Sequence, residues 1–257
     1  MNVDELNRRP YASIFCYPTP DWQLVDKRIE ELRYLGITEI EFTGDCMAAG
    51  VPVLGKGHEG IVVIAHLNGE RYALKVLRND GNRGNFFHEA EMLQEANKVS
   101  VGPKFHAVTK NFLISQLIDG GILAKWLEDN KNEKIFRRVV KDILEQCRRL
   151  DELGMDHGEL SNAPRHILMS ADGKPYIVDF ESASNKRVVS NVTTVCQYLF
   201  MGNSIAQGLI TEVMGEIDKK KIVAASREYK NDRSRENFDS LLKVLDQSLS
   251  PYEATNE

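Results

Sequence analysis

The sequence contains few cysteines, and none is placed as a cross-link or a zinc site would require. No Cys-x-x-Cys pair occurs, and no cysteine lies in a cluster with histidine. A disulfide framework is therefore not expected, and a reducing, cytoplasmic setting fits this usage best. The four cysteines are Cys16, Cys46, Cys147 and Cys196.

Long apolar runs are missing as well. No stretch of about 18 apolar residues occurs, and the opening MNVDELNRRPYASIF lacks the apolar centre of a signal peptide. We therefore expect no membrane partner. An excess of positive charge is also absent, because the net charge is −5 at pH 7. The total charge thus gives no sign of a dedicated nucleic-acid binder.

The chain has the length and composition of a folded protein. Its 257 residues, 42% hydrophobic and 28% charged, suffice for one large domain or two lobes with a real core. Strand patterns come first, at 37–44 and then over 51–78, where Asn68-Gly69 marks a hairpin. After Gly121 the pattern is mostly helical. This order predicts an α+β fold of two lobes.

Helical periodicity marks several segments. Over 85–99, Phe87, Ala90 or Glu91, and Gln94 stack on successive turns and predict a helix. Further helices are expected over 21–36, 123–130 and 133–154, the last with Phe136, Val140, Ile143, Cys147 and Leu150 along one face, and from 193 onward with interruptions near 201–204 and 231–235.

The segment LGKGHEGIV contains a G-x-G-x-x-G pattern at Gly55, Gly57 and Gly60, with Lys56 between the first two glycines. A dinucleotide-binding fingerprint would open a helix, but the β-branched residues after the last glycine continue as a strand. The strand–turn–strand arrangement instead suits a flap whose backbone N–H groups lie over triphosphate oxygens. An ordinary glycine-rich turn is the alternative.

Lys75 stands in the middle of an apolar strand, YALKV. A buried lysine needs a partner, because an unpaired ammonium is costly in an apolar surrounding. Glu89, on the next helix, is the favoured partner, and Glu91 is expected to be solvated. An edge-strand lysine that reaches water is the alternative.

Asp179 follows an apolar strand in YIVDFES. A carboxylate at this point needs a cation or backbone donors, and Mg²⁺ is a natural choice. The predicted hairpin turn at Asp172-Gly173 should bring His166 and Asp179 to one site. For His166 alone, a buried structural histidine is the alternative.

Together these motifs resemble the protein kinase-like superfamily over about residues 51 to 200, in the order of kinase motifs. The resemblance implies a bilobal fold: an antiparallel N-lobe sheet with one helix, and a mostly helical C-lobe. The segment SQLIDGG resembles the hinge, where Gln116, Leu117 and Ile118 would offer backbone groups to adenine. The Gly-rich loop, Lys75 and Glu89 would hold the phosphates of ATP.

The resemblance also assigns the catalytic loop. His157-Gly158-Glu159 matches the first triplet of that loop, so Glu159 stands where kinases have a catalytic aspartate. His166 stands near the place of the metal-binding asparagine, and Glu181 replaces the glycine of the Asp-Phe-Gly triplet. The implied ligands of Mg²⁺, or of Mn²⁺, are Asp179, His166 and Glu181, with Asn162 as a further candidate.

No Ala-Pro-Glu motif follows, and a helix is predicted to begin soon after the triplet, so the long activation segment is missing. This shortened pattern resembles the atypical lineage of RIO kinases, the small kinase of the tRNA threonylcarbamoylation complex and lipopolysaccharide-type kinases. It most resembles a group of predicted archaeal serine/threonine kinases with a Glu catalytic loop and an Asp-Phe-Glu triplet.

The function that the resemblance implies is an atypical serine/threonine protein kinase, which transfers the γ-phosphate of ATP to a hydroxyl of an unidentified protein. Glu159, Asp179 and Lys75 would be its catalytic residues. The alternatives are a small-molecule kinase of the aminoglycoside or choline kinase type, and a catalytically impaired ATP-binding pseudokinase or scaffold.

The expected domains are an N-terminal extension packed on the small lobe (1–50), the N-lobe (51–118) and the C-lobe (119–257). An RNA or ribonucleoprotein partner would use the basic residues at 219–221 and 227–235. A solvated helix face is the favoured interpretation of those residues.

Overall fold

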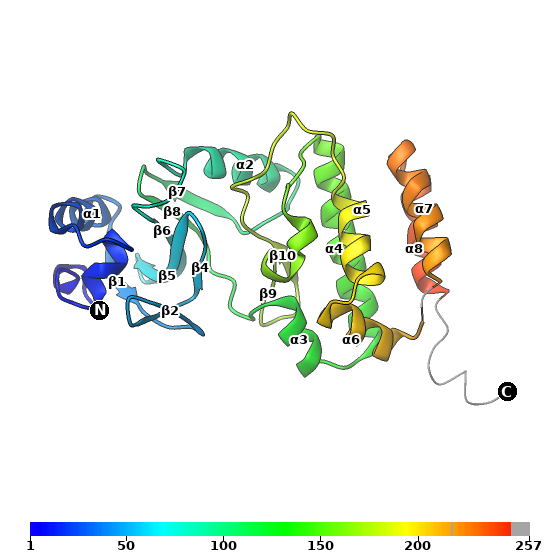
Figure 1. Ribbon diagram of the computed structural model, residues 1–257, viewed down its shortest axis with the longest axis horizontal. Coiled ribbons are helices and arrows are strands. Elements are labelled where there is room, and N and C mark those ends of the chain that lie inside the picture. Colours follow the sequence, from blue (N-terminus) through cyan, green and yellow to red (C-terminus); the bar gives the residue numbers. More distant parts are fainter. Residues whose placement is uncertain (217, 248–257) are drawn as a thin grey trace. The chain divides into compact units, whose positions relative to one another are not determined.

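The computed structural model describes residues 1–216 and 218–247, apart from the side chain of Asn162. It contains two compact units. The first comprises residues 1–94 and 103–117, and the second comprises residues 95–102 and the described residues from 118 onward. The first unit is built on an antiparallel sheet and the second mostly on helices, so the fold is α+β and bilobal, as predicted (Figure 1). The boundaries of the three expected domains stay a prediction.

The sheet of the first unit has the strand order β1-β5-β6-β8-β7, and β4 pairs with β5 beside this path. Its longest pair, β5 and β6, is joined at Asn68 and Gly69, which both have positive φ, as a tight hairpin turn of this hand requires. The elements of this unit are η1 (Val3–Glu5), η2 (Tyr11–Cys16), α1 (Trp22–Tyr34), β1 (Ile37–Glu41), β2 (Cys46–Ala48), β3 (Val51–Val53), β4 (Gly55–Lys56), β5 (Gly60–Leu67), β6 (Glu70–Leu77), the first turns of α2 (Phe87–Lys98), β7 (Phe105–Val108) and β8 (Phe112–Gln116).

The N-terminal segment belongs to the core of the first unit. Strand β1 pairs with β5, and α1 begins at the N-cap Asp21, whose Oδ1 accepts a hydrogen bond from a backbone N–H of the first turn. Buried residues of this segment, such as Phe15 and Leu32, share one apolar cluster with Ile61 and Phe112 of the sheet. The segment therefore completes both the sheet and its hydrophobic core.

A buried arginine joins this segment to the sheet. Arg28 is 2% exposed, and its Nη1 donates to the carbonyl oxygens of Phe15 at 2.9 Å and Leu77 at 2.6 Å. Its Nη2 donates to Asn111 Oδ1 at 3.1 Å. Burial lowers the pKa of the guanidinium from its usual value. These bonds satisfy the carbonyls of Phe15 and Leu77 and tie α1 to the end of β6.

The helix predicted over 85–99 is confirmed as α2. Its stacked residues are not its buried face: Phe87 is 53% exposed and Gln94 faces solvent, whereas Phe86 and Ala90 lie in an apolar cluster with Leu77 and Leu113. Two adjacent phenylalanines give two helical registers of equal spacing, and only packing against the sheet selects one of them.

The second unit is organised around α4, whose predicted apolar face is confirmed, because all of its members are buried. The helix begins after the N-cap Asn132 and ends at Gly154, which has φ +75 as a left-handed C-cap. The elements are the last turn of α2, α3 (Leu123–Asp129), α4 (Glu133–Leu153), η3 (Leu160–Arg165), β9 (Ile167–Met169), β10 (Pro175–Ile177), α5 (Asn191–Cys196), the π-helix η4 (Gln197–Met201), α6 (Ile205–Met214), α7 (Lys219–Asn231) and α8 (Arg235–Asp246).

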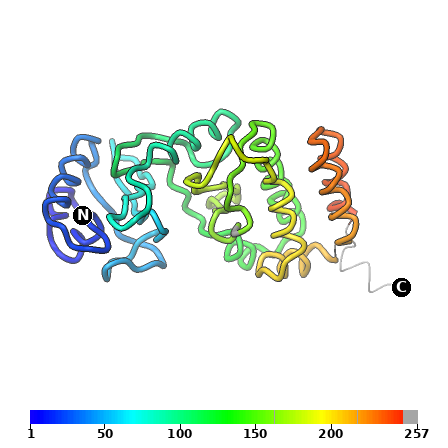
Figure 2. The backbone as a smooth tube through the Cα atoms, turned by 45° about the horizontal axis from the view of Figure 1, so that its top comes forward, coloured from blue at the N-terminus to red at the C-terminus, as the bar shows by residue number. Residues whose placement is uncertain are grey.

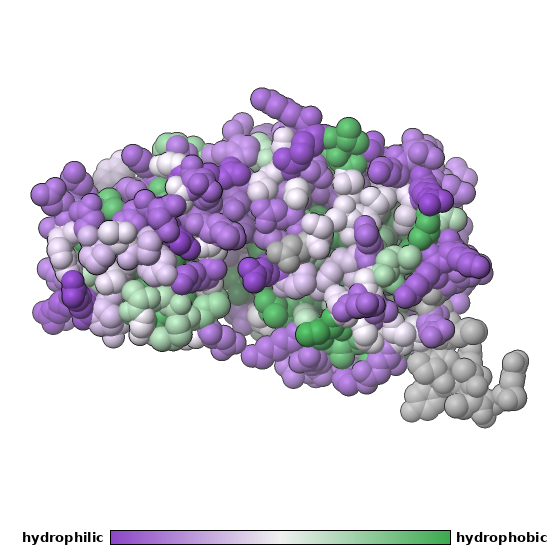
Figure 3. Space-filling view, in the orientation of Figure 1, coloured by the Kyte–Doolittle hydropathy of each residue, from purple (hydrophilic) through white to green (hydrophobic). Residues whose placement is uncertain are grey.

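The helices α7 and α8 lie side by side, with the rings of Tyr229 and Phe238 5.8 Å apart (Figure 2). The face drawn in Figure 3 is covered mainly by hydrophilic residues, with apolar side chains in small separate groups. Among the described residues, no helix combines the length and the apolar character that crossing a membrane requires.

Replacing Arg28 by methionine is expected to lower the free energy of unfolding by about 2–4 kcal/mol, because two buried carbonyls lose a charged donor. Urea denaturation measures the loss. Arg33→Met is the matched control: Arg33 forms an exposed ion pair with Asp4, so its replacement should cost no more than about 1 kcal/mol. Equal losses in the two variants would contradict this role of Arg28.

Candidate active site

The glycine-rich loop joins β4 and β5, and the N–H of Gly57 donates to the carbonyl of Gly60 at 2.8 Å. A Cβ at Gly60 would lie 2.9 Å from Cγ of Lys75, so packing alone requires glycine there. A Cβ at Gly55 or Gly57 would meet no other atom closer than 3.9 or 3.6 Å. The fold itself does not need glycine at these two positions, and their bare backbone leaves room for a ligand to approach.

Two contacts hold this loop in place. Nη1 of Arg78 donates to the carbonyl of Gly57 at 2.8 Å. The carboxylate of Glu59, which is 5% exposed, accepts hydrogen bonds from the N–H groups of Asn82 at 3.2 Å and Arg83 at 2.8 Å. The loop is therefore tied at both of its ends to the chain that follows β6.

Lys75 lies on β6, which pairs with β5 on one side and β8 on the other, so the edge-strand alternative is excluded. Its Nζ lies 2.9 Å from Oε1 and 2.8 Å from Oε2 of Glu89, and the two side chains are 13% and 8% exposed. The ring of Phe86 lies 5.6 Å from the same Nζ. Glu89 as the partner of Lys75 is confirmed, and Glu91 is exposed.

Three further residues were predicted to contact the nucleotide. Lys56 is exposed on the loop, with its Nζ 4.7 Å from the centre of the Tyr17 ring. Gln116 ends β8, and its N–H already donates to the carbonyl of Lys104 at 2.8 Å. Ile118 follows the strand as the first residue of the second unit in this part of the chain. Adenine recognition by the last two stays a prediction.

In the second unit, the β9–β10 hairpin brings His166 and Asp179 together. His166 directly precedes β9, and the N–H of Val178 donates to its carbonyl at 3.0 Å, which extends the pairing beyond the strands. The hairpin turns at Gly173, with φ +77. As a result, Nδ1 of His166 lies 3.9 Å from Oδ2 of Asp179, so the predicted convergence is confirmed.

His166 connects two carboxylates. Its Nε2 lies 3.1 Å from Oε2 of Glu159, and since a carboxylate can only accept, Nε2 carries the hydrogen. In the neutral imidazole, Nδ1 then presents a lone pair on the side of Asp179. The side chain is 5% exposed, and Nδ1 has no hydrogen-bond partner. A buried histidine nitrogen without a partner, opposite a carboxylate oxygen, has the chemistry of a metal ligand.

The separations around Asp179 fit a divalent ion. Ligand atoms at about 2.1 Å from one octahedral ion lie roughly 3 to 4 Å from each other, and the gap between His166 and Asp179 falls in that range. Carboxylate oxygens of Asp179 and Glu181 lie within 4.8 Å of each other. The side chain of Asn162, the further predicted candidate, lies outside the described residues.

Asp179 has an unusual backbone. Its φ is +70, in the left-handed region that residues other than glycine seldom occupy, although aspartate and asparagine tolerate it best. Such conformations persist where the surroundings fix them, and they concentrate at functional sites. Here the turn places the carboxylate, which is 32% exposed, two residues after the end of β10 and opposite His166.

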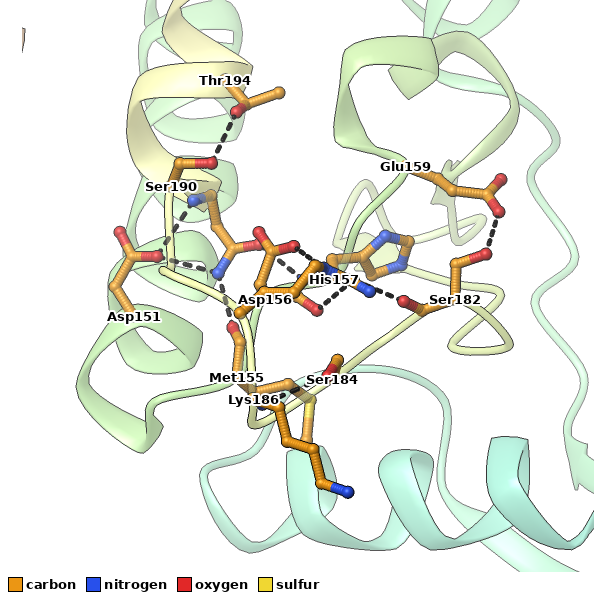
Figure 4. A network of polar contacts seen from close by, with 12 residues as sticks. Asp151, Met155, Asp156, His157, Glu159, Ser182, Ser184, Lys186, Ser190 and Thr194 are labelled. Carbon is orange, nitrogen blue, oxygen red and sulfur yellow. Dashed lines mark hydrogen bonds and ion pairs between the residues drawn. The ribbon is translucent and has the colours of Figure 1, made fainter.

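Glu159 is held by two partners. Its Oε2 receives the hydrogen bond from His166, and its Oε1 accepts one from the hydroxyl of Ser182 (Figure 4). The side chain is 33% exposed. Between Glu159 and His166, the chain is longer than in the usual catalytic loop and forms the 3-10 helix η3. Ser182 was missed from the sequence, and its place directly after the Asp-Phe-Glu triplet was the only available signal.

His157 is a buried residue that packs against the site. It is fully buried, and its Nε2 donates to the carbonyl of Val178 at 3.1 Å. Its ring meets those of His166 and Phe180 edge-on, with centroids 5.6 and 5.1 Å away. Burial, together with the neighbouring His166, lowers the pKa of His157 to about 4, which keeps the imidazole neutral near neutral pH.

A buried carboxylate anchors the start of the catalytic loop (Figure 4). Asp151 of α4 accepts hydrogen bonds from the side chain of Asn191 at 2.8 Å and from the hydroxyl of Tyr229 at 3.2 Å. Asn191 in turn accepts from the N–H of His157 at 2.9 Å and donates to the carbonyl of Met155 at 2.7 Å. Burial raises the pKa of Asp151. Sequence reasoning missed this network, although an aspartate beside an apolar stripe is a weak signal for it.

The link between Asp179 and α5 is short and is held against the catalytic loop. The backbones of Asp156 and Ser184 exchange hydrogen bonds of 3.0 and 2.9 Å. Nε of Arg187 donates to Oδ2 of Asp156 at 2.7 Å, and Nη2 donates to the carbonyl of Ser182 at 2.5 Å. Gly158 has φ +87, and a Cβ there would lie 2.8 Å from that carbonyl. The triplet His157-Gly158-Glu159 has glycine in its middle, where kinases usually have arginine, because Arg187 occupies the space that a side chain of residue 158 would need.

Two features define a protein kinase-like fold. The lobe built on an antiparallel sheet contains a buried lysine–glutamate pair. The helical lobe contains a loop with Glu159, followed by a hairpin that leads to Asp179. Comparison with known families matches residues 71–189 to the RIO domain. An uncharacterized protein of Methanocaldococcus jannaschii is 32% identical over 108 residues, which are 42% of this chain and 90% of that protein. The chain belongs to the RIO domain family, an atypical protein kinase-like family of ATP-binding phosphotransferases that generally use Mg²⁺.

Replacing Gly158 by alanine is expected to destabilise the protein more than replacing Gly154. Both residues have left-handed backbones, which cost alanine roughly 1–2 kcal/mol, but no atom lies within 4 Å of a Cβ at Gly154. At Gly158 the methyl group must also displace Arg187, which adds about 1–3 kcal/mol. Chemical denaturation of the two variants provides the comparison, and equal losses would show that Arg187 yields freely.

Proposed function

We propose that this protein is an atypical serine/threonine protein kinase that transfers the γ-phosphate of ATP to a hydroxyl group. The observation that carries the proposal is the line of groups Glu159–His166–Asp179, in which Nε2 of the imidazole is bonded to one carboxylate and Nδ1 faces the other. A histidine that ligates a metal commonly donates its other N–H to a carboxylate. His166 thus links the metal site at Asp179 to Glu159, the proposed base.

The phosphates are assigned to the first unit. Lys75, oriented by Glu89, supplies a fixed positive charge, and the bare backbone at Gly55 and Gly57 leaves room for the phosphates to approach the loop. The backbone of the hinge, from Gln116 to Ile118, is assigned to adenine. That these groups and Asp179 gather around a single triphosphate is part of the proposal.

The metal is assigned to the second unit. Asp179, His166 and Glu181 are the residues that would hold it, and Glu159 fixes the imidazole through Nε2. When bound, Mg²⁺ neutralises charge on the transferring phosphoryl group. A histidine nitrogen is a softer donor than the amide oxygen usual at this position, so Mn²⁺ suits this ligand set better than it suits a set of oxygens alone.

Glu159 is assigned as the group that accepts the proton of the acceptor hydroxyl. The hydrogen bond from Ser182 supports this role, because it presents an aliphatic hydroxyl to Oε1, the class of group that serine and threonine acceptors carry. Compared with aspartate, glutamate adds one methylene, and the helix η3 follows it directly. Since phosphoryl transfer depends mostly on positioning and electrostatics, a longer carboxylate is compatible with it.

Asp179→Asn is expected to weaken ATP binding about tenfold to a hundredfold when Mg²⁺ or Mn²⁺ is present, and to leave metal-free binding unchanged. Calorimetry with ATP, with and without each metal, measures both quantities. Asp129→Asn, at an exposed position on α3, is the matched control and should bind as the wild type does. Nucleotide binding that ignores both the metal and Asp179 would overturn the proposal.

Glu159→Gln should lower phosphate transfer by about 10²- to 10⁴-fold, because the amide cannot take up a proton, while the Kd for ATP stays within about threefold. The measurement is transfer of radiolabelled phosphate from ATP to protein substrates, to the protein itself (autophosphorylation) and to a panel of hydroxylated metabolites. Glu152→Gln, at an exposed position on α4, is the control.

Each result separates the candidate functions. Full phosphorylation activity in Glu159→Gln would rule out its role as a base. Transfer to metabolites alone would favour a small-molecule kinase, and ATP binding without any transfer would favour a non-catalytic nucleotide-binding protein.

A further inference from the structure

The segment before α1 runs alongside the chain that leaves β6, and both lie in the first unit. The N–H of Asn79 donates to the carbonyl of Tyr17 at 2.9 Å. The side-chain nitrogen of Asn79 donates to the carbonyls of Cys16 at 2.8 Å and Thr19 at 2.9 Å. Asn79 thus donates hydrogen bonds to three carbonyls of this segment, and these bonds hold the segment beside the end of β6.

The ring of Tyr17 is placed against two cations by this arrangement. Nζ of Lys56, on the glycine-rich loop, lies 4.7 Å from the ring centre, and the guanidinium carbon of Arg78 lies 5.1 Å from it. Both distances are within the range of cation–π attraction, which draws a cation toward the negative face of an aromatic ring. Tyr17 is half-buried, and its ring also packs against the apolar core of the unit.

Arg78 connects the ring of Tyr17 to the backbone of the glycine-rich loop. The same guanidinium donates to the carbonyl of Gly57 at 2.8 Å and is paired with Asp80 at 2.7 Å. Its backbone N–H donates to the carbonyl of Glu59 at 2.9 Å. The loop is therefore connected to Tyr17 twice, once through Lys56 and once through Arg78.

We propose that Tyr17 is a positioning residue for nucleotide binding: it sets the glycine-rich loop in the conformation that receives the phosphates, through Lys56 and Arg78. This inference rests on the proposed function, and it gives the N-terminal segment a part in the site beyond completing the sheet. A loop fixed before binding loses less conformational freedom when the ligand arrives, and this difference appears as affinity.

The role predicts a dependence on the phosphates of the ligand. A loop that lies over phosphates contributes to the binding of ATP and contributes nothing to adenosine, which lacks them. Loss of a purely structural residue would weaken both ligands together. Comparing ATP with adenosine therefore distinguishes positioning of the loop from general loss of structure.

The test uses the full chain with Tyr17→Leu, Tyr17→Phe and the matched control Tyr34→Leu, since Tyr34 lies at the end of α1 and is 88% exposed. Calorimetry with Mg²⁺ gives the Kd of ATP and of adenosine for each variant. Tyr17→Leu is expected to raise the Kd for ATP about five- to tenfold and to leave adenosine unchanged, because two cation–π contacts are lost. Tyr17→Phe, which keeps the aromatic face, and Tyr34→Leu should stay within about twofold of the wild type.

Three outcomes would overturn the inference: an unchanged Kd for ATP in Tyr17→Leu, an equal weakening of ATP and adenosine, or a Tyr17→Phe variant as weak as Tyr17→Leu. If Tyr17→Leu does not fold, Tyr17→Met, which keeps the volume without the aromatic face, takes its place under the same expectations. Failure of the wild type to bind ATP would instead overturn the proposed function, so the two failures are distinguishable.

Discussion

Charge withdrawn from water constrains both units of this protein, since each buried ion needs a partner and each partner belongs to another element. Lys75 requires Glu89, which ties α2 to β6. Arg28 requires the carbonyls around it, which ties α1 to the end of β6. Asp151 requires donors from α5 and α7. Removing one partner from such a pair costs more than the pair contributes in isolation. Lys75 and Glu89 lie on the elements that these pairs hold, and the catalytic loop follows α4, the helix that carries Asp151.

Local spacing explains what could be predicted from the sequence. A lysine inside an apolar strand and a glutamate on the next helix are sufficient to predict the pair that the structure contains. Likewise, a hairpin turn between His166 and Asp179 is sufficient to bring their side chains together. The fold class followed from the order of strands and helices. In each of these cases the information lies within a short stretch of chain, where hydrogen-bond geometry leaves few alternatives.

Contacts between irregular segments could not be predicted, because they leave no periodic trace. Arg187 reaches back to Asp156, and Asn191 to His157, over 31 and 34 residues of chain. Tyr17 meets Lys56 from the short link between η2 and α1. The short strands β2 and β7 were missed because three or four residues carry too little alternation to be recognised. The helix α2 was predicted from its spacing, but two adjacent phenylalanines satisfy similar spacings, so the spacing did not show which of them is buried.

The bonds that Arg187 makes have a bearing on how such a protein is controlled. In kinases with a long activation segment, a phosphate added to that segment orders it by pairing with arginine. Here the segment is reduced to 180–190, and Nε and Nη2 of its Arg187 already donate to a carboxylate and to carbonyls of the same unit. A phosphate added to so short a link would compete with these partners for the same guanidinium. It would exchange bonds that already exist, whereas in the longer segments it orders a stretch of chain.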